Sequence, residues 1–131
     1  MNKPILVIAT LMGIIAIILG AFAAHGLKQL ISPEAILTFE TGVKYQMYHA
    51  LFLLMVGTSQ MVQEKSKRLI LWLTLLGILF FSGSIYGLAT NELSMFDFKT
   101  IAFITPIGGF LLILAWTFLL INFLKLKKDK S

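Results

Sequence analysis

The amino-acid sequence predicts an all-α integral membrane protein, in which a bundle of four membrane-spanning helices carries one additional amphipathic helix at the membrane surface. The 131 residues are 58% hydrophobic and only 13% charged, and a soluble domain of this size would leave too much apolar surface uncovered. Charged residues are absent from four windows, residues 4–27, 45–63, 69–91 and 100–124. A helix needs about 20 apolar residues to cross a hydrocarbon core about 30 Å thick, so each window can span it. The windows are too long for barrel strands and lack the alternation of such strands.

We expect a single membrane domain over residues 1–131, with spans over approximately residues 4–25, 44–62, 69–90 and 101–124. The first span resembles a secretory signal, because a basic start precedes it and Ala21-Phe22-Ala23 fits a cleavage site. Its apolar run of about 20 residues is longer than the 7 to 15 of a signal sequence. We therefore expect this helix to be retained.

The additional helix is predicted over approximately residues 33–43. Ser32 is suited to cap it, Pro33 to occupy its first position and Glu34 to lie in its first turn. Apolar residues recur at helical spacing, at Ile36, Phe39, Val43 and Met47. This amphipathic pattern predicts a helix in the outer membrane interface, with a turn into the second span near Gly42.

The basic residues fall unevenly on the two sides of the predicted bundle. The termini and the second loop carry Lys3, Lys65, Lys67, Arg68, Lys125, Lys127, Lys128 and Lys130, whereas the other side carries Lys28, Lys44 and Lys99. Because cytoplasmic loops are enriched in Lys and Arg, we expect a multi-pass protein of the cell membrane with both termini in the cytoplasm. The basic tail lies directly beside a membrane end. This placement favours anionic membrane lipids, and not nucleic acid, as partners.

No motif in the sequence points to metal, cofactor or nucleophilic chemistry. Cysteine is absent, which excludes disulfides and thiolate metal ligands. The two histidines, His25 and His49, lie in different predicted helices and lack the spacing of a metal motif. We therefore expect no metal and no cofactor. Whether the protein is an enzyme stays open, and the missing motifs argue against it.

Four segments carry a resemblance to a known family. They are GAFAAHGL at residues 20–27, FETGVKYQMYHAL at 39–51, SGSIY at 82–86 and TPIGG at 105–109. Together they resemble the domain-of-unknown-function family 423, to which animal transmembrane protein 256 looks related. The resemblance implies a bacterial-type membrane protein of four helices, and it implies no particular activity.

Polar and aromatic side chains gather near the predicted outer ends of the spans, which suggests a site there. The candidate ligand-binding residues are His25, Glu40, Lys44, Tyr45, Tyr48, His49, Tyr86 and Thr105. A straight helix places Tyr45 and His49 on one face and Glu40 on the opposite face. Glu40 can therefore join the same site only if the chain turns near Gly42.

These residues also have structural explanations. Glu40 and Lys44 are four positions apart and can pair along a helix, the histidines can bond between helices, and the tyrosines suit an interfacial aromatic belt. Small residues at four-residue spacing predict close helix contacts at Ala16, Gly20, Ala24, Gly83 and Gly87.

Three functions follow as open alternatives. The first is binding of a small amphiphile, lipid headgroup or ion at the outer cluster. The second is a structural or assembly role, in which the same residues hold a bundle or a homo-oligomer together. The third is an intramembrane enzyme or a proton-coupled carrier that uses a histidine, although the spans lack the membrane-embedded acid on which ion-coupled carriers of this size rely.

Overall fold

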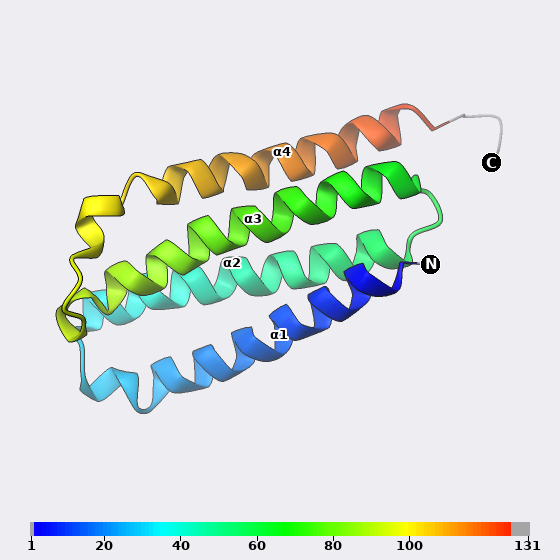
Figure 1. Ribbon diagram of the computed structural model, residues 1–131. Helices are drawn as coiled ribbons and strands as arrows, with labels where there is room; N and C mark the ends of the chain where they lie inside the picture. The colour runs from blue at the N-terminus through cyan, green and yellow to red at the C-terminus, as the bar shows by residue number, and fades with distance from the viewer. Residues whose placement is uncertain (1, 127–131) are drawn as a thin grey trace.

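The computed structural model describes residues 2–126, and its fold is all-helical (Figure 1). Its long helices are α1 (Lys3–Ala24), α2 (Pro33–Thr58), α3 (Glu64–Ala89) and α4 (Ile104–Leu124). Short 3-10 turns, Leu27–Gln29, Asn91–Leu93 and Phe98–Ile101, lie in the first and third connections. The predicted all-α class is confirmed. The part of the basic tail from residue 127 onward lies outside the described residues.

The helices lie side by side and alternate in direction, and each packs against the next one in the sequence (Figure 1). Within residues 2–126, α1 and α4 make no extensive contact with each other and lie at opposite edges. A bundle in which the helices surround a common core, the usual form of the predicted four-helix bundle, needs that contact. The described helices form an open row instead.

The row has two distinct ends (Figure 1). The start of α1, the end of α4 and the short connection of residues 59–63 lie together at what we call the terminal end. The connections of residues 25–32 and 90–103 lie together at the opposite end, which we call the loop end. Most of the residues predicted to form the outer cluster belong to the half of the row nearer the loop end.

The helix predicted to begin after Ser32 is present, but it is longer than expected. Ser32 Oγ accepts a hydrogen bond of 3.1 Å from the Ala35 N–H, and Pro33 takes the first helical position. The predicted turn near Gly42 is absent, because α2 continues without a break to Thr58. Gly42 instead makes room for α3, since a Cβ at this position would lie 2.7 Å from Cε1 of Tyr86. The predicted interfacial helix is thus the first part of α2.

Within residues 2–126, three segments are long and apolar enough to cross a membrane, namely Lys3–Gln29, Glu64–Ala89 and Ile104–Leu124. They include α1, α3 and α4. Helix α2 does not reach the same hydropathy, because Lys44, Gln46 and His49 lie within it. Gln46 and His49 are nevertheless buried inside the protein, so their polar groups do not face the surroundings of the helix.

Helices α3 and α4 are in tight contact at two glycines. A Cβ at Gly77 would lie 2.6 Å from Cδ2 of Leu112, and a Cβ at Gly108 would collide with the backbone nitrogen of Phe81. Gly83 was predicted to mark a close contact, and this prediction is wrong. It is exposed, and a Cβ there would meet nothing within 4 Å, because it lies on a face of α3 that no other helix covers.

Candidate functional site

The eight candidate residues do not form one cluster. His25 is exposed at the end of α1, where its backbone N–H caps the helix by donating to the carbonyl of Phe22. Lys44 and Tyr48 are exposed on α2, and Glu40 is half-buried. No ion pair joins Glu40 to Lys44, although both lie within the described chain. Because α2 does not turn near residue 42, nothing redirects Glu40 toward the face that carries residues 45 and 49.

Tyr86 belongs to a hydrogen-bond chain that crosses three helices. Its hydroxyl donates to Oε1 of Gln46 at 2.6 Å, and Nε2 of Gln46 donates to the carbonyl of Met12 at 2.9 Å. Beside this chain, Ser82 Oγ donates to the carbonyl of Gly42 at 2.8 Å. Gln46 and Ser82 were not predicted from the sequence to bond between helices. Each bonds to a backbone carbonyl on another helix, and a backbone acceptor leaves no pattern in the sequence.

Thr105 joins α4 to α3 near the loop end. Its hydroxyl shares a short hydrogen bond with the hydroxyl of Ser84. Pro106, which follows, lies in the first turn of α4 and therefore marks a helix start and not a bend within the span. Thr105 thus holds two helices together in this structure.

Tyr45 and His49 are brought together, as their spacing predicted. They line a groove of about 810 Å³ between α2 and α4, with Phe81 of α3 beside them. The remaining lining comes from α4 alone, from Pro106, Gly109, Phe110, Leu112, Ile113, Trp116, Thr117 and Leu120. The lining is mainly apolar, and its polar atoms come from few residues. Trp116 was not among the candidates, because nothing in the sequence separates it from an ordinary lipid-facing tryptophan.

His49 lies at the wall of this groove and is only 4% exposed. Its Nδ1 lies 2.7 Å from the carbonyl oxygen of Tyr45, and its Nε2 lies 3.2 Å from the indole nitrogen of Trp116. A carbonyl can only accept, so Nδ1 carries a proton. The indole N–H can only donate, so Nε2 carries none. The two neighbours therefore select one neutral tautomer of His49 and occupy both ring nitrogens.

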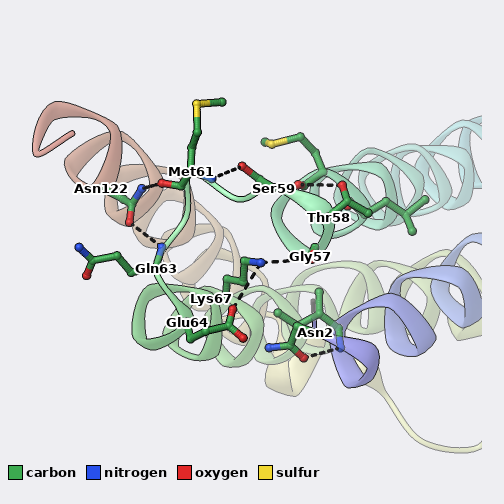
Figure 2. Close-up of polar contacts among 12 residues, drawn as sticks. Asn2, Gly57, Thr58, Ser59, Met61, Gln63, Glu64, Lys67 and Asn122 are labelled. Atoms are coloured by element: carbon green, nitrogen blue, oxygen red, sulfur yellow. Dashed lines mark hydrogen bonds and ion pairs between the residues drawn. The ribbon is translucent and has the colours of Figure 1, made fainter. Parts of the chain in front are cut away.

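A second polar region lies at the terminal end, away from the predicted outer cluster (Figure 2). The Lys67 side chain is only 4% exposed. Its Nζ donates to the carbonyl of Gly57 at 3.2 Å and lies 3.4 Å from Oε2 of Glu64. Lys67 entered the sequence analysis only as one of the charges that set orientation. Its burial follows from the packing of α3 against the end of α2.

Asn122 of α4 fastens the connection between α2 and α3 (Figure 2). Its Nδ2 donates to the carbonyl of Met61 at 2.9 Å, and its Oδ1 accepts from the backbone N–H of Gln63 at 3.3 Å. The short connection between residues 58 and 64 is therefore held from the side by the last helix.

The sequence matches the family model described as "Protein of unknown function (DUF423)" over residues 19–109. A UPF0382 membrane protein of Haemophilus influenzae is 40% identical over 116 residues, which cover 88% of this chain and 90% of that protein. The UPF0382 membrane protein YwdK of Bacillus subtilis is 34% identical, with 94% of this chain and 98% of the relative covered. The UPF0382 inner membrane protein YgdD of Escherichia coli is 32% identical, over 97% and 94% respectively. No solved structure matches.

Proposed function

This chain belongs to the DUF423 family, whose relatives are membrane proteins, and from this premise we propose that it binds a small amphiphile of the membrane in the groove between α2 and α4. The observation that carries the proposal is the groove itself, with Tyr45 and His49 on one wall and α4 on the other. The eight-residue cluster expected from the sequence gives less support, because its members lie apart.

The size and chemistry of the groove suit a molecule with a hydrocarbon chain. Ligand pockets commonly enclose about 300–1,000 Å³ and are lined by apolar side chains with a few polar groups, and this groove has about 810 Å³. Both nitrogens of His49 are engaged, and the Thr117 hydroxyl donates to the carbonyl of Ile113. Among the described residues, the Tyr45 hydroxyl has no partner. The ligand would place one polar group near Tyr45 and its chain along α4.

The proposal includes a membrane arrangement. Helix α2 would be the fourth span, since the polar groups of Gln46 and His49 are hydrogen-bonded within the protein, an arrangement that lowers the cost of polar residues in lipid. The first part of α2, with Glu34 and Lys44 exposed, would lie in the outer interface. The terminal end would be cytoplasmic, as the excess of Lys and Arg there predicts. Lipids, and in the assembly alternative a second copy, are the partners that this arrangement allows.

A fluorescent fatty acid, cis-parinaric acid, tests the proposal on the full chain in detergent. Ile113 lines the groove and Leu79 does not, and both side chains are 62% exposed. We expect Ile113→Trp to fill the groove and weaken binding about tenfold, which corresponds to about 1.4 kcal/mol. Leu79→Trp should bind as the wild type does. Equal binding by both variants, or no saturable binding by the wild type, would refute the groove as the site.

A structural or assembly role is the second candidate. The interhelical bonds of Gln46 and Ser82 favour it, and so do the bonds of Asn122 to the connection between α2 and α3, because residues that hold the helices together need no ligand. If this role is correct, substitutions that remove these hydrogen bonds lower the melting temperature or change the number of copies in the assembly. A carrier that moves protons on His49 gains no support, since both of its ring nitrogens are already bonded.

A further inference from the structure

A second pocket, of about 490 Å³ and with several polar residues in its lining, lies at the terminal end, distinct from the groove between α2 and α4. Helix α1 contributes Leu6 and α3 contributes Glu64 and Lys67. The end of α2 and the connection that follows it contribute Thr58, Ser59, Gln60, Val62 and Gln63. Figure 2 shows the α2–α3 side of this pocket, with Lys67 between the end of α2 and the start of α3. The proposed groove uses none of these residues.

Lys67 is the unusual residue of this pocket. Its side chain is almost fully buried, whereas its nearest carboxylate, Glu64, is 62% exposed and lies 3.4 Å from Nζ. Its one hydrogen bond to another described residue is to the neutral carbonyl of Gly57. Removing an ammonium from water costs several kcal/mol unless close charges and hydrogen bonds replace the lost solvation. One carbonyl and one solvent-screened carboxylate replace only part of it.

The other polar groups of the pocket add donors for an anion. Ser59 Oγ accepts a hydrogen bond from the N–H of Met61, so its own proton remains to be donated. The Gln60 side chain has no hydrogen bond within residues 2–126, and its amide carries two donors. Glu64 is the sole carboxylate in the lining, and it is already paired with the Lys67 ammonium.

We propose that this pocket binds a phosphate group, with the Lys67 ammonium as its central charge and Ser59 and Gln60 as flanking donors. An ammonium is a common point-charge partner of phosphate. Exposed cations at the same end, Lys3, Lys65 and Arg68, raise the local concentration of anions. The phosphate comes either from a lipid headgroup or from a small soluble molecule. This inference does not depend on the groove and is not affected if the groove binds nothing.

Thermal unfolding of the full chain in detergent, at constant ionic strength, tests the proposal with two probes. The soluble probe is inorganic phosphate, with sulfate-free chloride buffer as the reference. The lipid probe is short-chain phosphatidic acid, compared with a diacylglycerol of the same chain length. A rise in melting temperature with inorganic phosphate identifies a soluble ligand, and a rise with phosphatidic acid alone identifies a headgroup. If neither probe raises the melting temperature, the proposal is wrong.

Three variants assign the response to this pocket. Lys67→Gln should remove the rise, whereas Lys65→Gln, which removes an exposed charge two residues away, should keep it. Lys67→Gln can also destabilise the end of α2, because Lys67 bonds to Gly57 there. Gln60→Glu avoids this effect, because the Gln60 side chain is exposed and has no hydrogen bond within residues 2–126. Gln60→Glu should weaken binding about tenfold or more by placing a carboxylate beside the anion, and Gln29→Glu at the loop end should have no effect. An unchanged response in Gln60→Glu, or an equal loss in Gln29→Glu, contradicts the proposal.

Discussion

The indole N–H of Trp116 donates a hydrogen bond to Nε2 of His49 across 3.2 Å, and this bond connects α4 to α2 although the two helices are not neighbours in the row. The ring of Phe52 lies beside them, with its centroid 4.2 Å from that of Trp116. The wall of the groove is therefore held by a polar bond and by aromatic contacts among these three rings.

Trp116→Phe tests how much the polar bond contributes. The substitution keeps an aromatic ring but leaves Nε2 of His49 without a donor, and we expect it to lower the free energy of unfolding by about 1 kcal/mol. Trp72→Phe is the matched control, because Trp72 is 55% exposed, Trp116 is 50% exposed, and the Trp72 indole has no partner among the described residues. Unfolding in detergent, followed by circular dichroism, measures both. Equal losses in the two variants would show that the bond contributes nothing.

Tyr86→Phe removes the hydroxyl that Gln46 accepts from while preserving the ring that packs on Phe39. Oε1 of the buried Gln46 is then left without its donor, so we expect a loss of about 1–2 kcal/mol. Tyr48→Phe should change stability by less than about 0.5 kcal/mol, since Tyr48 is exposed. The same unfolding measurement compares them, and a larger effect at Tyr48 would contradict the hydrogen-bond chain.

Gly42→Ala tests whether Gly42 serves close packing. The new methyl group would lie 2.7 Å from Cε1 of Tyr86 and 3.1 Å from Cγ2 of Ile85, and crowding of this kind costs about 1–3 kcal/mol. Gly83→Ala, where the methyl group meets nothing within 4 Å, should be neutral or should stabilise α3 by up to about 1 kcal/mol. We expect the melting temperature to fall in Gly42→Ala and to stay the same or rise in Gly83→Ala. A stable Gly42→Ala variant would show that the two helices are not packed as closely as described.

The membrane arrangement can be tested with single cysteines, because the native chain has none. We expect Lys65→Cys to react with a membrane-impermeant maleimide only after the cytoplasmic side is opened. Lys28→Cys and Lys99→Cys should react from outside intact cells. If Lys28→Cys and Lys65→Cys react from the same side, α2 does not cross the membrane and is not a fourth span.

The parts of the fold that local sequence determines were predicted well. The cap at Ser32 and the helix that starts at Pro33 follow from side-chain chemistry within one turn. The apolar windows predicted the segments that form α1, α3 and α4, because the hydropathy of a segment depends on its composition alone. Tyr45 and His49 were placed on one face from helical periodicity, and they share a groove.

The parts that depend on contacts between helices were not predictable from a single sequence. Gly42 was interpreted as a turn because glycine breaks helices, and only the position of Tyr86 reveals that it makes room for a neighbour. Lys67 was counted as a loop charge, because its burial against Gly57 results from the packing of two helices. The candidate residues lie apart for the same reason. They were predicted at a similar depth in the membrane, but their side chains point in different directions around their helices.

In the open row, helices that pack against each other are also neighbours in the sequence. Each helix packs mainly against the helix that precedes or follows it. Chains fold from the N-terminus as they are synthesised, and here α1 and α2 can pack before α3 has been translated. No contact between the first and last helices has to form before the row is complete, so assembly can follow the order of synthesis.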